Sequence, residues 1–452
     1  MSDYYCLPFS SHPQRDQLYD ELHARPFHPI VTPQQISHLA FTATPRELDK
    51  SFTLICELCR RYGVAQPGHG GVSFLHDFGA FFVRWERHLE FYTLTIMRLA
   101  PCHERPFESR VLDIMPEDWL GVLPGQAVAA LHLAVGDENL DVSQEELVRM
   151  FDGERLVISR PKEGRALLCT AFKLHGDGFG RILIQNGDIS EYQMGRLVQR
   201  IYEIETYRLL AQLPIPTAKR LAPELHEMDR QLADMLAHLP GIDSSAAERD
   251  LLERLSMLST RLETWRAETN YRFSATRAYQ DLVMSRLTNI REAEVEGHMT
   301  VAEFIARRFN PGLRTIEWAQ TWMEDLSRRI ERAGDMLRTR VNLAMQEQNK
   351  CLLAAMNRRS YLQLRMQETV EGLSVAAISY YLVGLIGYVL GVLPLESLHL
   401  DKKTAMALVV PMVLVSVWWT VRRIKDRLIR LPDGAVGGCS DVRGKPRVEG
   451  DR

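Results

Sequence analysis

Two long apolar segments near the end of the chain constrain its fold more than any other feature. Residues 370–393 read VEGLSVAAISYYLVGLIGYVLGVL with a single charge, and residues 405–421 read AMALVVPMVLVSVWWTV with none. A bilayer core of about 30 Å needs roughly 20 mostly apolar helical residues, so the first segment spans it and the second is just long enough. The connection between them, residues 394–403, leaves room only for a turn. The sequence therefore predicts a transmembrane hairpin over residues 369–421.

The charges around this hairpin predict its orientation. Arg358, Arg359 and Arg365 precede the first segment. A basic collar follows the second segment and consists of Arg422, Arg423, Lys425, Arg427 and Arg430. Because lysine and arginine gather on the cytoplasmic flanks of membrane spans, we expect both chain ends in the cytoplasm and the turn outside. The first residues show no basic region followed by an apolar run, so we expect no signal peptide.

The chain before the hairpin divides into two regions, of which the first is residues 1–187. Alternating apolar residues and turn signals there predict an α/β domain with a mixed sheet. Its expected elements are a strand near His38, a helix over Pro45–Tyr62, a hairpin or long bent strand over Phe78–Ile96, and strands over Ala127–Val135, Glu154–Ser159, Ala166–Lys173 and Phe179–Gln185. Cys56 and Cys59 lie on the predicted helix without a second cysteine pair, so we assign both to the core.

Residues 188–368 predict helical hairpins and a long stalk helix. The expected elements are helices over Ser190–Leu213 and Pro223–Leu239 and a coiled-coil seam through Leu251, Leu255, Leu258 and Leu262. Thr300 caps a short helix, and Asn310-Pro311 supplies the N-cap and first-turn proline of the next one. No proline follows until Pro394, so one helix on the order of 120 Å long runs from Pro311 into the membrane. Residues 422–452 hold the basic collar and a tail, and the Gly- and charge-rich composition after Pro432 predicts that the tail is disordered.

One polar cluster in the α/β domain is a candidate site and consists of Arg84, Glu86, His88 and Glu90. At alternate positions of a strand these residues share one face, and Trp85, Leu89 and Phe91 face the core. Four adjacent titratable groups can bind an ion or a polar ligand, whereas on a solvated sheet they form cross-strand charge pairs. We favour the charge pairs over the ligand site.

The first apolar segment carries a stripe of residues at intervals of three and four, which places them on one face of a helix. The stripe consists of Gln363, Met366, Val370, Leu373, Ala377, Tyr381, Gly384 and Tyr388. The pore-lining candidates are Gln363, Met366, Val370, Ala377, Tyr381, Gly384 and Tyr388, together with Gly387. Gly387 and Gly391 form a small-residue motif that permits close contact between helices. Such a stripe lines a pore in an oligomer or forms a packing seam, and the sequence leaves both interpretations open.

Several fragments of the chain are similar to a known family. The fragments HPQRDQLYDELHARPF, RWERHLEFYT, TVAEFIARRFNP, MLRTRVN and QETVEGLSVAAISYYLVGLIGY resemble a bacterial family of predicted membrane-anchored proteins, which is catalogued as a domain of unknown function. The resemblance covers nearly the whole chain. It implies a multi-pass protein of the bacterial inner membrane and brings no established activity.

The order of the regions is more distantly similar to the CorA-type divalent-cation transporters, which are homopentamers whose first span lines the pore. Residues 384–389 read GLIGYV where the first span of those transporters ends in Gly-Ile-Tyr-Gly-Met-Asn. Gly387 matches that run, whereas the Met-Asn pair is absent. In this comparison the basic collar corresponds to the basic cluster after the second span, and Glu396 and Asp401 are candidates for the external mouth.

These observations favour a CorA-like homo-oligomeric ion channel or transporter, with a divalent cation as the transported or regulatory ion. The resemblance implies a pentamer. The alternative is a membrane-anchored cytoplasmic binding or scaffold protein, in which the hairpin only tethers the chain. The net charge of -3 argues against a nucleic-acid partner. No nucleophile–base pair or metal-ligand cluster is visible, so we expect no catalytic residue, no resident metal or cofactor, and no enzyme.

Overall fold

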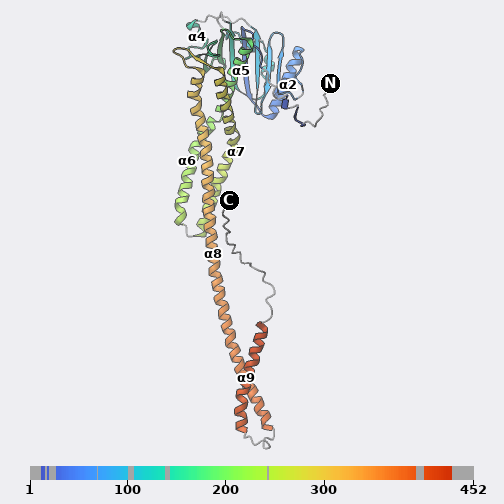
Figure 1. Cartoon of the computed structure of the whole chain (residues 1–452), viewed down its shortest axis with the longest axis vertical. Coiled ribbons are helices and arrows are strands. Elements are labelled where there is room, and N and C mark those ends of the chain that lie inside the picture. The colour runs from blue at the N-terminus through green and yellow to red at the C-terminus, as the bar shows by residue number, and fades with distance from the viewer. Residues whose placement is uncertain are drawn as a thin grey trace, which may run out of the picture. The chain divides into compact units, whose positions relative to one another are not determined.

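The computed structural model describes residues 12–15, 18–19, 27–68, 70–99, 106–137, 143–241, 244–392 and 402–429. The chain forms two compact units, residues 1–338 and residues 339–452. The first unit contains a sheet and most of the helices, and the second contains the end of helix α8 and helix α9 (Figure 1).

One mixed sheet of nine strands is the centre of the first unit. The strands are β1 (Gln34–Thr42), β2 (Ser73–Asp77), β3 (Phe82–Arg87), β4 (Phe91–Leu99), β5 (Gln126–Gly136), β6 (Val157–Arg160), β7 (Ala166–Leu174), β8 (Gly180–Asn186) and β9 (Ala293–Glu294). Their spatial order is β2-β3-β4-β1-β5-β8-β7-β6-β9. Among these described strands, β5 and β8 pair in parallel and all other pairs are antiparallel. The expected α/β domain with a mixed sheet is confirmed, and β2 and β9 are additions that the sequence did not predict.

The helices are α2 (Pro45–Tyr62), α3 (Glu117–Leu120), α4 (Gln144–Met150), α5 (Glu191–Gln212), α6 (Ile215–His238), α7 (Ser245–Ile290), α8 (Val301–Val392) and α9 (Lys402–Ile429), with 3-10 turns η1 (Val111–Ile114) and η2 (Leu239–Gly241). Strand alternation gives the sheet two apolar faces. Ile36 and Leu133 share a core with α5 on one face, and Val83 and Trp85 share a core with α2 on the other. Cys59 is buried in the second core, where burial raises the pKa of its thiol to about 11. This confirms its assignment to the core.

The core on the α5 side of the sheet continues along the helices. It includes residues of α6 and α7 and follows α8 as far as Leu337. The seam predicted on α7 is buried as expected, at Leu251, Leu255, Leu258 and Leu262. Helix α6 begins at Ile215 and contains Pro223, whereas the sequence predicted that proline as its start.

The helix boundary predicted at Asn310-Pro311 is wrong, because α8 is continuous through both residues. Phe309, Leu313 and Ile316 lie in the core on both sides of the proline, each about 1% exposed. Their packing holds the helix together although Pro311 lacks one backbone donor. The cap at Thr300 is confirmed, since its hydroxyl accepts a hydrogen bond from the Glu303 backbone N–H at 3.1 Å.

Helices α8 and α9 are both long and apolar enough to span a membrane. The apolar segments lie within Val301–Val389 of α8 and over Met406–Arg423 of α9. Only 6% and 11% of these apolar segments are buried, whereas the core helix of a soluble protein would be mostly buried. Glu396, Asp401, Arg430 and the predicted disordered tail lie outside the described residues.

Candidate functional site

The predicted polar strand face is interrupted by a tight turn. Strand β3 ends at Arg87, and the His88 backbone N–H donates to the Phe91 carbonyl at 2.9 Å, which closes a two-residue hairpin loop. Leu89 in that loop is 84% exposed and does not face the core. The Phe91 ring stacks on the His88 ring, with 4.1 Å between the centroids, so Phe91 lies on the side predicted to be polar. The four polar residues therefore do not form one continuous strand face.

Arg84 and Glu86 form a buried ion pair on the α5 side of the sheet. The Arg84 guanidinium donates to the Glu86 carboxylate at 2.8 Å and, more weakly, to the Gln199 side-chain oxygen on α5 at 3.4 Å. Both charged side chains are less than a tenth exposed. Gln199 in turn donates to Glu203 at 2.8 Å, and Arg286 of α7 donates to Glu203 at 2.5 Å. The ion pairs Arg84–Glu86 and Arg286–Glu203, bridged by Gln199, thus join β3, α5 and α7.

A cavity of about 210 Å³ lies beside this network, lined by Glu86, His88 and Thr93 from the sheet side and by α5 and Arg286. The Thr93 hydroxyl is buried and has no hydrogen-bond partner among the described residues. His38 also lines the cavity, but both of its ring nitrogens are within hydrogen-bond distance of threonine hydroxyls. Burial, reinforced by the charge of Arg84, lowers the pKa of His38 to about 3. His38 is therefore a neutral core residue.

Glu90, the fourth predicted residue, belongs to a different contact. Its carboxylate accepts hydrogen bonds from Arg272 at 2.9 Å and from the Tyr279 hydroxyl at 2.6 Å, both on α7. The structure thus places Glu86 and His88 at the cavity, with Arg84 paired to Glu86. Glu90 instead links the hairpin loop to α7.

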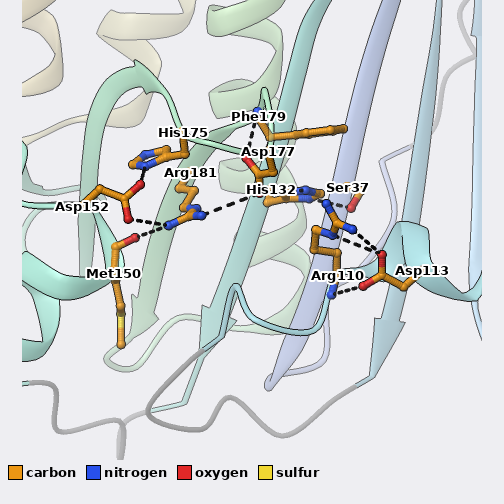
Figure 2. Close-up of polar contacts among 10 residues, drawn as sticks. All are labelled: Ser37, Arg110, Asp113, His132, Met150, Asp152, His175, Asp177, Phe179 and Arg181. Carbon is orange, nitrogen blue, oxygen red and sulfur yellow. Dashed lines mark hydrogen bonds and ion pairs between the residues drawn. The ribbon is translucent and has the colours of Figure 1, made fainter.

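A second polar cluster, which the sequence did not predict, lies across β1, β5 and β8 (Figure 2). His132 of β5 is hydrogen-bonded through Nδ1 to the Ser37 hydroxyl at 2.9 Å, and its Nε2 lies 4.0 Å from Asp177. Arg181 lies 3.7 Å from Asp177 and 3.6 Å from Asp152. Burial lowers the pKa of His132 to about 4. The cluster joins three strands that are neighbours in the sheet but far apart in the sequence. Of its members, only Asp177 lies in a motif that the sequence shows, the turn after His175.

Ser37, His132 and Asp177 are residue types of a catalytic triad, but their geometry does not form one. Ser37 is fully buried in the middle of β1, so no substrate can reach its hydroxyl. The 4.0 Å separation of His132 from Asp177 is also too long for a hydrogen bond. In the part of the chain that the structure describes, no group of three or more His, Cys, Asp or Glu residues could hold a metal ion.

The stripe of α8 lies away from α9. Among the described side chains of this helix pair, Ser379 of α8 and Val413 of α9 are the most buried. A Cβ atom at Gly387 would lie 2.8 Å from Met406 of α9. Gly387 therefore faces α9, as its small-residue motif permits, and does not lie on the exposed stripe with the other pore-lining candidates. The other pore-lining candidates, Gln363, Met366, Val370, Ala377, Tyr381, Gly384 and Tyr388, are all exposed.

The basic collar begins directly after the apolar part of α9. The guanidinium groups of Arg422 and Arg423 lie over the rings of Trp418 and Trp419, at 4.9 and 4.6 Å from the ring centroids. Lys425 and Arg427 also belong to α9, but their side chains lie outside the described part of the structure.

Fold and sites together define a class: a protein with an α/β unit, long helices and two helices apolar enough to cross a membrane. Residues 10–428 match a family model described as "Protein of unknown function (DUF3422)". The chain belongs to this family, which confirms the resemblance to a family of unknown function. No curated protein matches the chain.

Proposed function

We propose that α8 and α9 cross the bacterial inner membrane as a hairpin and that copies of the chain assemble around the stripe of α8 to form a cation-conducting pore. The observation that carries this proposal is the direction of the stripe. Ala377 and Tyr381 lie two residues before and after Ser379, so a helix with 3.6 residues per turn turns them to the face opposite the α9 contact. A hairpin with α9 on one side presents the stripe on the other.

The chemistry of the stripe supports contact with protein or water rather than lipid. Tyr381 is 76% exposed and lies near the middle of the predicted span. Tyrosine prefers the membrane interface, where its hydroxyl is hydrated, and is out of place against lipid tails at mid-span. An oligomer in which the stripe faces a shared axis gives the Tyr381 hydroxyl polar surroundings.

Charge supports the orientation of the hairpin. Arg358, Arg359 and Arg365 precede the first span, and Arg422 and Arg423 follow the second. These flanks favour a cytoplasmic location for both ends of the hairpin and for the α/β unit.

A second candidate function is a membrane-anchored binding protein without transport. The cavity beside Glu86 and His88 favours it, because a buried hydroxyl without a partner lines that cavity at Thr93. In this case the hairpin tethers and oligomerises the chain, and the α/β unit binds the partner.

Flux through proteoliposomes separates the two candidates. We expect the purified full-length protein to be an oligomer by native mass and to conduct Mg²⁺ or K⁺ into liposomes. Ala377→Trp places a large side chain on the stripe and should reduce the flux at least tenfold without changing the mass. Ile378→Trp is the matched control, because Ile378 is exposed on a neighbouring face.

Two results would contradict the pore. One is a monomeric or dimeric protein in mild detergent, and the other is flux that Ala377→Trp leaves unchanged. An oligomer that conducts no cation would favour the anchored binding protein.

A further inference from the structure

A second cavity in the first unit, of about 430 Å³, lies between β6, β7, α5 and the first turns of α8. Its volume is in the range of small-molecule sites. Leu156, Phe172, Ile305 and Phe309 form an apolar wall, and four cationic side chains line the cavity with one carboxylate. It shares no lining residue with the cavity beside Glu86.

The wall contains an ordered stack of rings and guanidinium groups. The rings of Phe172 and Phe304 are nearly parallel with centroids 5.0 Å apart. Arg308 lies 4.0 Å from the centroid of Phe304, and Arg208 lies 5.8 Å from that of Phe172. Stacking holds a guanidinium group by its face and leaves the N–H groups at its edge available for a ligand.

The backbone presents Phe172 in an unusual conformation. Its φ of 49° lies in the left-handed region, which a bulky residue rarely adopts. The pairing of β7 with β8 is irregular between Thr170 and Leu174, so the strand bulges where Phe172 meets α8. Bulges of this kind re-aim side chains beside binding sites.

Two of the four cations lack a counter-charge among the residues that the structure describes. Arg208 pairs with Glu205, and Lys173 pairs with Glu154, both at 2.5 Å. Arg155 and Arg308 are exposed and have no ion pair with any described residue. Two uncompensated guanidinium groups at one cavity match the charge of a phosphate monoester, which is about -1.5 to -2 at pH 7.

We propose that this cavity binds a small organic phosphate, with the phosphate between Arg155 and Arg308 and a planar apolar part on the wall around Phe172 and Ile305. The arginine side chains supply charge-assisted hydrogen bonds, and the wall excludes water from the ligand's ring. The site does not depend on the α8 N-terminus, whose first backbone N–H groups, at Val301 and Ala302, already donate to Glu292.

Such a ligand would join the sheet to α8. Arg155 stands before β6, whereas Arg308 belongs to α8, the helix that continues into the apolar segment. Binding at both residues would therefore favour one arrangement of β6 and α8 over others. This inference is independent of the proposed pore, since it concerns only the first unit.

The probe is adenosine monophosphate, titrated into the full-length protein in detergent by isothermal calorimetry. Two matched ligands serve as controls: adenosine lacks the phosphate charge, and inorganic phosphate lacks the ring. We expect the nucleotide to bind at least tenfold more tightly than either. The double variant Arg155→Gln/Arg308→Gln should weaken the nucleotide at least tenfold, because each charged hydrogen bond contributes roughly that factor. Arg314→Gln, an exposed arginine elsewhere on α8, should leave it unchanged.

Three outcomes would overturn the proposal. Adenosine could bind as tightly as the nucleotide, inorganic phosphate alone could do so, or the double variant could bind like the native protein. A melting curve of the double variant that matches the native protein shows that any loss of binding is not a loss of fold.

Discussion

His132 and His38, two buried histidines of the sheet, make folding sensitive to pH at the scale of single residues. Burial lowers the pKa of His132 to about 4 and that of His38 to about 3, from 6.5. Around His132 the charge of Asp177 opposes this shift, whereas Arg110 and Arg181 reinforce it. Below pH 6.5 the unfolded chain binds protons that the folded chain excludes. Stability is therefore complete above pH 6.5 and is lost as the pH falls toward 4.

The variant His132→Asn tests this linkage and keeps a polar group opposite Ser37. Protonation linked to His132 should lower the free energy of unfolding of the native protein by on the order of 3 kcal/mol between pH 7 and pH 4. The variant should show a shallower dependence on pH, even though it is less stable at pH 7. Urea denaturation followed by tryptophan fluorescence at several pH values measures both slopes. His238→Asn, at an exposed position on α6, is the control, and equal slopes for His132→Asn and the native protein would refute the linkage.

At the scale of elements, the sequence correctly predicted the helix bounds and caps that depend on residues close together in the chain. Helix α2 has its predicted bounds, and the cap at Thr300 is where the sequence placed it. The missed features depend on distant contacts. Asn310-Pro311 predicted the start of a helix, but core packing on both sides of the proline keeps α8 continuous. Strand β9 has two residues and pairs with β6, which is far from it in the sequence. The cluster around His132 was invisible because its members come from strands that only the sheet topology brings together.

A substitution at Pro311 tests whether core packing keeps α8 helical against the cost of the proline. A proline inside a helix costs about 3 kcal/mol relative to alanine, because a hydrogen bond is lost and the ring crowds the preceding turn. Pro311 is exposed, so Pro311→Ala removes no core contact and should stabilise the first unit by about 1–3 kcal/mol. Pro45→Ala is the matched control, since a proline at the first position of α2 interrupts no hydrogen bond and should give no gain. Thermal melting measures both, and a lower melting temperature for Pro311→Ala would show that the ring is needed for packing.

At the scale of the whole molecule, the division at Arg338 predicts that the first unit folds without the apolar helices. The core that starts in the sheet ends at Leu337 of α8, and residues 342–370 contribute nothing to it. A chain of residues 1–338 therefore keeps the buried residues of that core and lacks the apolar segments of α8 and α9. We expect it to remain in the supernatant after membranes are sedimented, whereas the full chain sediments and requires detergent. Its melting temperature should lie within a few degrees of the corresponding transition in the full chain, because the same apolar surface is buried in both. Aggregation of the truncated chain, or full-length protein that stays soluble without detergent, would show that the apolar helices belong to the fold of the first unit and not to a membrane.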